Sequence, residues 1–468
     1  MSGIRSYGAY IPKYRLGAET AGWTYRGEKA VANFDEDSIT MAVAAGTDCL
    51  KGLDRSLVDG ILFATTTPPY LEKQNAALIA TALDLRRDIS SADVTSVLRA
   101  GTTAIRMASE AVESGHAKNV LVAAADCRMA APRDPLEPSL GAGAAALLIS
   151  SEDVAAEIEA VHSVTENVLD IWRSEDDTFI RSWEDRFVIE EGYLRIIPEA
   201  VKAFLSSQKL TPKDFQKAIY HSSDARRHGQ LARMLGFEEG QVQDPLYGQM
   251  GNTGAAFSLM LLVAALEEAK AGDRILVAAY GDGCDVLSVR VNEKVKAMKD
   301  GRRGVKAHLE SKRILKSYDE YARWRELMPT AAARRPAPAM PSVSALLRET
   351  DKNLRLHAVR CKQCRYRQFP PERVCVKCQT RDQFEPERLS DVPAEVFTYS
   401  LDYVAGTPDI PLVVAVINFE GGGRMLCMMT DRETEDVRIG LPVEMSFRKL
   451  RTVGGIHNYY WKSTPVRV

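Results

Sequence analysis

Four cysteines near the C-terminal end of the chain have the types and spacing of a metal site. Cys361, Cys364, Cys375 and Cys378 form two CxxC pairs separated by ten residues. Four thiolates held in this way suit a tetrahedral Zn²⁺ ion with Zn–S bonds of about 2.3 Å, and they leave no coordination position for water. We therefore expect a structural zinc site rather than a catalytic one. An iron ion held by the same ligands is the alternative.

The composition limits the classes of partner. The 468 residues are 45% hydrophobic and 26% charged, which is typical of globular protein. A formal net charge of -2 gives no electrostatic reason to expect nucleic acid or membrane as a partner. The N-terminal sequence has no apolar run of signal-peptide length, and the longest apolar run, AAFSLMLLVAAL, is too short to cross a bilayer. We expect a soluble, cytoplasmic protein.

Apolar runs alternate with amphipathic stretches in the first part of the chain. VDGILFAT, NVLVAAAD, AALLIS and RILVAAYGDG predict buried strands, and GTTAIRMASEAVESG and AAFSLMLLVAALEEAKAG predict helices. This alternation predicts an α/β fold with helices on both faces of a buried sheet. Gly-rich turns at Gly101 and Gly251 each lead into a long helix and a buried strand. The similarity of these two segments predicts a pseudo-duplicated, five-layered α-β-α-β-α body.

The sequence predicts four parts along the chain. The α/β body covers residues 1–292, and a charged, partly helical and Pro/Ala-rich linker covers 293–352. The linker is either a solvated spacer or a segment that packs onto the body. A zinc ribbon follows at 353–385. Alternating strands such as AEVFTYSL and PVEMSFRKL then predict a small β-barrel at 386–468.

Five segments of the body resemble, in the same order, segments of the 3-hydroxy-3-methylglutaryl-CoA synthases of the thiolase superfamily. They are MSGIRSYGAYIPKYRL, EPSLGAGAAALLIS, ENVLDIWRS, YGQMGNTGAAFSLM and YGDGCDVLSVRV. The C-terminal part resembles the rubredoxin-like zinc ribbon and OB-fold domain that accompanies thiolase-like enzymes as a partner subunit or a fused domain. The resemblance implies a thiolase-like fold, a coenzyme A thioester as substrate and a homodimer. A partner thiolase or other acyl-CoA enzyme is a further expectation.

The family's chemistry implies a cysteine that takes the acyl group, a histidine and a glutamate. His221 matches the histidine, and Asn252 matches the asparagine beside it. The cysteine position falls on Leu98 and the glutamate position on Thr66. The resemblance therefore implies that covalent acyl transfer is lost, whereas the pair that stabilises an enolate is kept. A structural histidine and a helix-capping asparagine are the simpler interpretations of the same two residues.

Aldol or retro-aldol chemistry beside a CoA thioester fits the residues that remain. Such chemistry needs a stabilised enolate oxygen and a proton carrier, and it needs no acyl-enzyme. We expect His221 and Asn252 to stabilise the enolate. The candidate proton carriers are Asp282, Tyr247, Tyr280 and Asp224.

Two other functions stay open. Cys284 in the GDGC loop is the candidate for a displaced nucleophile in an acyltransferase, whereas Cys127 fits a packing role at a strand end. A non-catalytic scaffold that binds acyl-CoA and docks a partner thiolase is the third function. The basic segment 299–306 is either a contact for CoA phosphates or a solvated surface. The loop at Gly281 lacks the GxGxxG spacing of a dinucleotide site.

Overall fold

The computed structural model describes residues 2–221, 224–329 and 339–467. By its contacts the chain divides into two compact units. The first unit runs to Ala32 and continues through Asp37–Ala80 and Leu85–Tyr321. The second unit consists of Asn33–Glu36, Thr81–Asp84 and Ala322–Val468. The domain boundaries expected from the sequence stay a prediction. The second unit also includes two short segments from the N-terminal part of the chain.

A nine-stranded sheet runs through the first unit in the order β11-β12-β13-β8-β1-β7-β6-β4-β5. The strands are β1 (Gly3–Tyr10), β4 (Gly60–Thr65), β5 (Ser90–Thr95), β6 (Asn119–Cys127), β7 (Ala142–Ser150), β8 (Ala156–Thr165), β11 (Lys217–Tyr220), β12 (Arg274–Tyr280) and β13 (Gly283–Val291). Only two residue pairs join β1 to β8, Gly3 with Glu157 and Ile4 with Ala156. The sheet is therefore two halves that meet at this short junction.

The two halves have the same topology. In each half the first strand pairs antiparallel with the last, β1 with β7 and β8 with β13. The last strand pairs antiparallel with the strand before it, and that strand pairs in parallel with an earlier one. The first half ends at β5, and in the second half Val242 makes a parallel bridge to Ala218 at the corresponding edge. The predicted pseudo-duplication is confirmed.

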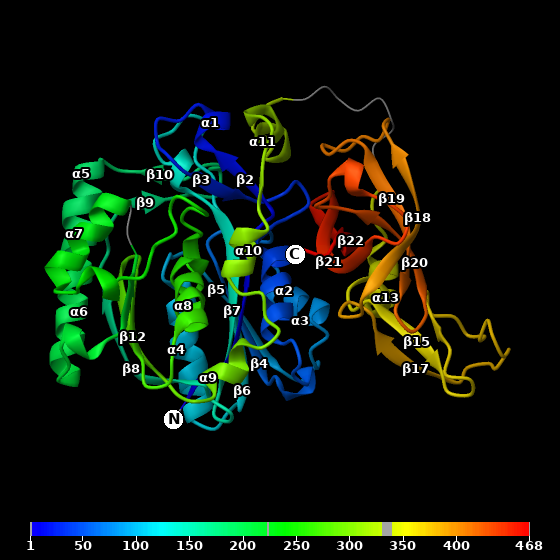
Figure 1. Ribbon diagram of the computed structural model, residues 1–468, viewed down its shortest axis with the longest axis horizontal. Helices are drawn as coiled ribbons and strands as arrows, with labels where there is room; N and C mark the ends of the chain where they lie inside the picture. Colours follow the sequence, from blue (N-terminus) through cyan, green and yellow to red (C-terminus); the bar gives the residue numbers. More distant parts are fainter. Residues whose placement is uncertain (1, 222–223, 330–338, 468) are drawn as a thin grey trace. The chain divides into compact units, whose positions relative to one another are not determined.

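Helices separate and cover the two half-sheets, which gives the five predicted layers (Figure 1). The central layer holds α4 (Ala100–Glu113) and α8 (Phe257–Glu268). The outer layers hold α2 (Ser38–Cys49) and α3 (Asn75–Ala82) on one side, and α6 (Leu194–Gln208) and α7 (Ala225–Leu235) on the other. Residues Phe257 to Val263 of α8 are all buried, because this helix contacts both half-sheets. The long apolar run of the sequence is thus a core helix.

Shorter elements complete the first unit. They are β2 (Tyr14–Gly17), β3 (Glu28–Val31), β9 (Ile171–Trp172), β10 (Arg181–Ser182), β14 (Arg313–Ile314), α1 (Ala18–Ala21), α5 (Asp185–Phe187), α9 (Val295–Lys299), α10 (Lys306–Glu310), η1 (Arg55–Leu57), η2 (Glu137–Ser139), η3 (Val188–Tyr193), η4 (Pro212–Asp214), η5 (Glu239–Gln241) and η6 (Gly254–Ala256). A further helix, α11 (Tyr318–Trp324), spans the boundary between the units. Much of the Pro/Ala-rich stretch predicted as a connector, residues 330–338, lies outside the described residues.

The second unit contains a three-stranded sheet and a closed barrel. After α12 (Val343–Arg348) and α13 (Thr350–Asn353), the sheet is formed by β15 (His357–Cys361), β16 (Arg367–Gln368) and β17 (Phe384–Arg388). The barrel closes in the order β18-β19-β20-β22-β21. Its elements are β18 (Ala394–Asp402), β19 (Leu412–Phe419), β20 (Arg424–Met429), η7 (Thr434–Asp436), β21 (Pro442–Val453) and β22 (Ile456–Pro465). This barrel confirms the OB fold expected from the resemblance.

A buried ionic cluster stabilises the second unit. Arg448 contacts Asp35 at 3.0 Å, Glu36 at 2.8 Å and Asp431 at 2.6 Å, and Lys462 contacts Asp35 at 2.8 Å. Burial alone would raise the pKa of Asp35, but Lys462 and Arg448 lower it below its usual range. The Asp35 carboxylate is therefore charged, and Arg448 and Lys462 together stabilise its charge.

Among the described residues, no helix is long and apolar enough to cross a bilayer.

Candidate active site and metal centre

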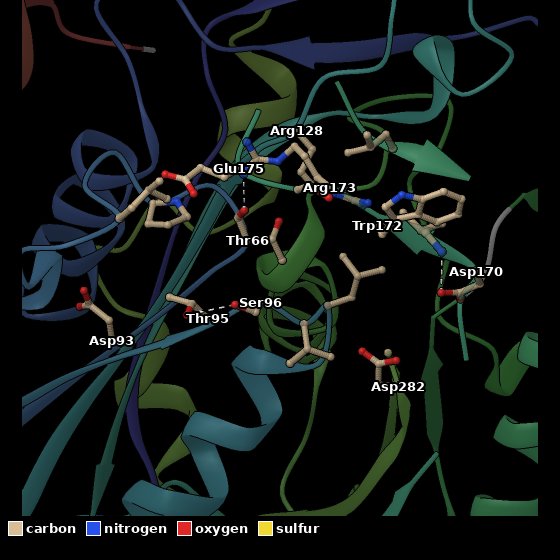
Figure 2. Close-up of a pocket in the computed structure, with 18 of the residues that line it drawn as sticks. Thr66, Asp93, Thr95, Ser96, Arg128, Asp170, Trp172, Arg173, Glu175 and Asp282 are labelled. Atoms are coloured by element: carbon tan, nitrogen blue, oxygen red, sulfur yellow. Dashed lines mark hydrogen bonds between the residues drawn. The ribbon is translucent and has the colours of Figure 1, made fainter. Parts of the chain in front are cut away.

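The first unit contains a cavity of about 570 Å³ at the carboxyl ends of several strands. Its wall is formed by residues that follow β4, β5, β6 and β12, together with the segment 170–175 (Figure 2). Ligand sites of α/β proteins commonly lie at the carboxyl ends of the strands, because loops from neighbouring strands converge there. The cavity is therefore the candidate binding site.

Leu98 and Thr66 both line this cavity. Leu98 lies two residues before α4 begins, and a Cβ atom added at Gly281 would lie 3.0 Å from the Leu98 nitrogen. The loop after β12 therefore packs closely on the start of α4. A thiol at the start of a helix is activated by the helix dipole, but the aliphatic side chain of Leu98 has nothing to ionise.

A buried carboxylate organises the wall at Thr66. Asp126 is fully buried at the end of β6. It accepts hydrogen bonds from the hydroxyls of Thr65, Thr66 and Thr67 at 2.8 to 2.9 Å, and from the backbone nitrogen of Ala255 at 2.7 Å. The ATTT segment is thus a set of donors for Asp126. The sequence analysis missed this role, although an Asp after an apolar strand was a visible signal.

His221 and Asn252 lie together, as expected from the resemblance. The Asn252 amide Nδ2 lies 3.2 Å from His221 Nε2, and Asn252 Oδ1 accepts from the Gly254 backbone at 2.9 Å. His221 is only 1% exposed and packs between the rings of Tyr193 and Phe257. Burial, aided by the charge of Arg128, lowers the pKa of His221 to about 3, so the ring is neutral. Neither residue of the pair lines the cavity.

Two carboxylates line the cavity: Asp282, which follows β12, and Asp170, which directly precedes β9. Asp282 is exposed there in a left-handed backbone conformation with φ of 45°, which costs energy for a non-glycine residue. Asp170 is 8% exposed and accepts a hydrogen bond from the Tyr280 hydroxyl at 2.7 Å. Burial raises the pKa of Asp170. Sequence analysis named Asp282 and Tyr280 but missed Asp170, although the DIW segment carried the resemblance.

The other predicted residues lie away from the cavity wall. Tyr247 is buried and stacks on Phe257 with ring centroids 5.3 Å apart. Asp224 caps α7 by accepting from the Arg227 backbone at 3.0 Å. Cys284 is fully buried, and burial raises the pKa of its thiol. Among the described residues, no cysteine lines the cavity.

The basic segment 299–306 is anchored to the body. Lys299 Nζ donates to the Ala269 carbonyl at 2.7 Å, and Arg302 donates to the Met298 carbonyl at 3.0 Å. Neither cation faces a carboxylate in these contacts. A CoA contact in this segment stays a prediction.

The four-cysteine cluster has the geometry of a tetrahedral metal site. The four sulfur atoms lie within 4.8 Å of one another, and the pairs Cys361–Cys378 and Cys364–Cys375 are each 3.6 Å apart. The edge of a tetrahedron with bonds of about 2.3 Å is about 3.8 Å, so the spacing fits one metal ion. A disulfide would need about 2.0 Å between the sulfurs. The cluster therefore fits a zinc ribbon.

Comparisons with known proteins agree with the class that the fold and the cavity define, a thiolase-like body. Residues 205–292 match the family model of the 3-oxoacyl-[acyl-carrier-protein] synthase III C terminal, and residues 387–448 match that of the ChsH2 C-terminal OB-fold domain. A crystal structure of HMG-CoA synthase complexed with CoA superposes with a TM-score of 0.63 at 19% identity, covering 69% of this chain and 89% of that chain. For 3-oxoacyl-[acyl-carrier-protein] synthase III from Aquifex aeolicus the TM-score is 0.57 at 23% identity, covering 62% of this chain and 100% of that chain. These structures share the fold of the first unit.

Sequence relatives narrow this class. The chain is 33% identical over 341 residues to the hydroxymethylglutaryl-CoA synthase of Methanopyrus kandleri, covering 69% of this chain and 97% of the relative. It is 32% identical over 343 residues to the enzyme of Methanocaldococcus jannaschii, covering 70% and 99%. The chain belongs to the hydroxymethylglutaryl-CoA synthase family, with a C-terminal zinc-ribbon and OB-fold extension.

Proposed function

We propose that this protein makes or breaks a carbon–carbon bond beside a CoA thioester by aldol or retro-aldol chemistry, without an acyl-enzyme. The observation that carries this proposal is Leu98 in the cavity wall at the start of α4. In the resembling enzymes a cysteine at this position takes the acyl group. The family and the CoA named with a structural relative support a CoA thioester as the substrate.

The remaining groups can serve enolate chemistry. Asp170 and Asp282 line the cavity and are the candidate proton carriers, and the raised pKa of Asp170 suits a general acid and base. His221 and Asn252 are proposed to stabilise the thioester oxygen as it becomes an enolate. Both are enclosed, so the cavity wall must open toward them when substrate binds.

Exchange of the α-protons of an acyl-CoA in D2O tests enolate formation without knowledge of the second substrate. We expect wild-type protein to exchange the α-protons of acetyl-CoA, as seen by mass spectrometry, and the His221→Ala variant to lose about a hundredfold or more in rate. The variant His116→Ala, on an exposed turn, is the matched control. Unchanged exchange in His221→Ala would remove the assigned role of this residue.

A non-catalytic scaffold that binds acyl-CoA is the second candidate function. The enclosure of His221 and Asn252, neither of which lines the cavity, favours it. It predicts CoA binding without proton exchange, and co-purification of a partner thiolase. Any exchange that depends on the cavity residues contradicts it.

An acyltransferase with a displaced nucleophile is disfavoured. A fully buried thiol with a raised pKa supplies little thiolate, and Cys284 does not line the cavity. This function requires an acyl adduct on Cys284 after incubation with acyl-CoA.

We propose that Cys361, Cys364, Cys375 and Cys378 hold a structural Zn²⁺ ion. With four thiolates as ligands, the ion supplies folding energy to the ribbon and takes no part in the chemistry of the cavity. A homodimer, expected from the resemblance, stays a prediction.

A further inference from the structure

A buried glutamate lies in the turn before β7, and the proposed chemistry does not use it. Glu137 begins η2, is 0% exposed and does not line the cavity. Its carboxylate accepts hydrogen bonds from the Tyr318 hydroxyl of α11 at 2.7 Å and from the Arg133 backbone nitrogen at 2.9 Å. Its backbone carbonyl accepts from Lys29 Nζ at 2.8 Å. Because a buried polar group is costly without partners, these three bonds fix the first residue of η2 in place.

The same turn binds the backbone of Asn252 on both sides of the peptide unit. The Ser139 carbonyl accepts from the Asn252 backbone nitrogen at 2.7 Å, and the Gly141 backbone nitrogen donates to the Asn252 carbonyl at 3.0 Å. Leu140, between these two residues, forms a parallel bridge with Asn252. The position of the Asn252 backbone is therefore set by the turn that Glu137 begins.

Two glycines bring these backbones into direct contact. A Cβ atom at Gly141 would lie 1.8 Å from the Met250 carbonyl oxygen, and one at Gly251 would lie 2.9 Å from the Gly141 nitrogen. Ala30 of β3 also donates to the Met250 carbonyl at 2.9 Å. With so little space between the two segments, a shift of the turn before β7 must move the segment that carries Asn252.

The Asn252 side chain passes this position on to His221. Its Oδ1 atom accepts from the Gly254 backbone at 2.9 Å, which fixes the plane of the amide. Its Nδ2 atom lies 3.2 Å from His221 Nε2, at the long end of the range for a hydrogen bond. A backbone shift of about half an ångström away from the ring would therefore break this contact.

We propose that Glu137 is a positioning residue that holds Asn252 in contact with His221. The proposal rests on the proposed function for the roles of His221 and Asn252, and it adds a residue that touches no substrate. Since Glu137 lies outside the cavity wall, its loss should leave substrate binding unchanged and slow the reaction.

Substrate affinity and reaction rate, measured separately on the full-length protein, test this inference. In Glu137→Gln, which has one acceptor oxygen fewer, we expect α-proton exchange at saturating acetyl-CoA to fall about tenfold or more. Calorimetry should show an affinity for acetyl-CoA within about twofold of wild type. Tyr318→Phe removes one donor and should have a smaller effect of the same kind. Glu267→Gln, which changes a carboxylate that also accepts two backbone hydrogen bonds, is the matched control and should change neither quantity.

The ring nitrogens of His221 give a second measurement that needs no turnover. In protein labelled with ¹⁵N at histidine, the His221 Nε2 signal should shift in Glu137→Gln, shift less in Tyr318→Phe and stay in place in Glu267→Gln. An unchanged rate and an unchanged His221 signal in Glu137→Gln would overturn the inference, and so would a parallel loss of affinity and rate. If Glu137→Gln does not fold, Tyr318→Phe decides by the same two measurements. Wild type without proton exchange would defeat the proposed aldol chemistry, and the His221 signal would still decide whether Glu137 positions Asn252.

Discussion

At the scale of residues, the resemblance predicts that the site combines replaced and retained groups of the family. The resemblance places the family's thiol and carboxylate at Leu98 and Thr66, which both line the cavity. It places the histidine and asparagine at His221 and Asn252, whose Nε2 and Nδ2 atoms lie 3.2 Å apart. Thr66 has a defined structural task as a donor to Asp126. Thr66 is therefore integrated into the hydrogen-bond network of the cavity wall.

The neutral state of His221 gives a prediction at this scale. Burial lowers its pKa to about 3, so the ring should stay neutral from about pH 5 to pH 8, where a free imidazole gains its charge. NMR of protein labelled at histidine, with His221→Ala for assignment, should show one ring signal that does not move over this range. A midpoint near pH 6 for that signal would contradict the buried, neutral ring.

The resemblance assigned positions of the family's site to Leu98, Thr66, His221 and Asn252, and only Asn252 lies within one of the five similar segments. Glu137 and Asp170 were missed for a physical reason. Their significance depends on burial and on hydrogen-bond partners from distant segments, and neither property is visible in a linear sequence. The enclosure of His221 was equally invisible, since the rings of Tyr193 and Phe257 come from distant segments.

At the scale of elements, helix α8 couples the core to the segment after β13. Near its end, Glu267 accepts from the Val305 backbone at 2.8 Å and the Lys306 backbone at 3.3 Å. The apolar pattern predicted this helix correctly, because an uninterrupted apolar run is typical of a helix buried on all sides. The contacts of the Glu267 carboxylate could be identified only in the folded structure.

Glu267 should make stability depend on pH. Burial raises its pKa from 4.5 to about 7, so folding disfavours the charged form. Its contribution is then fully present below about pH 4.5 and is lost as pH rises through about pH 7. Urea unfolding at pH 5 and pH 8 should show a larger loss in wild type than in Glu267→Gln. An equal loss in both proteins would show that Glu267 does not titrate in this range.

The cysteine cluster gives a prediction for the ribbon. Purified protein should contain about one zinc ion per chain, measured by elemental mass spectrometry. Cys378→Ser should lose most of the metal and speed hydrogen exchange in β15 and β17, because metal binding contributes folding energy. Cys427→Ser, which changes a buried barrel cysteine outside the cluster, should keep the metal. Iron in place of zinc would correct the identity of the ion, and absence of any metal would refute the site.

At the scale of the whole molecule, the second unit depends on residues from the N-terminal part of the chain. Asn33–Glu36 and Thr81–Asp84 belong to this unit, and Asp35 and Asp84 bind cations from its C-terminal sequence. A domain boundary drawn at a single point of the sequence does not reveal that these two N-terminal segments belong to the second unit. Patterning predicted the ribbon and barrel correctly, but two of the partners of Arg448, Asp35 and Glu36, lie more than four hundred residues away.

Removal of Asp35 should destabilise the second unit strongly. Asp35→Ala leaves Arg448 and Lys462 buried without their shared partner, which typically costs about 3–5 kcal/mol. Hydrogen exchange of the β21 and β22 amides should report this loss. Asp351→Ala, which removes an exposed carboxylate that pairs with Arg355, should change stability by less than about 1 kcal/mol. Equal effects of the two substitutions would contradict the importance of the buried cluster.

The central claim is that the chain forms no acyl-enzyme, and intact-protein mass spectrometry after incubation with acetyl-CoA tests it most directly. The Leu98→Cys variant is the matched positive control, because it restores a thiol at the start of α4. We predict no added acyl mass on the wild-type protein under conditions in which Leu98→Cys gains an acyl group at residue 98. An acyl adduct on wild type, located at Cys284 or any other cysteine, would contradict the account.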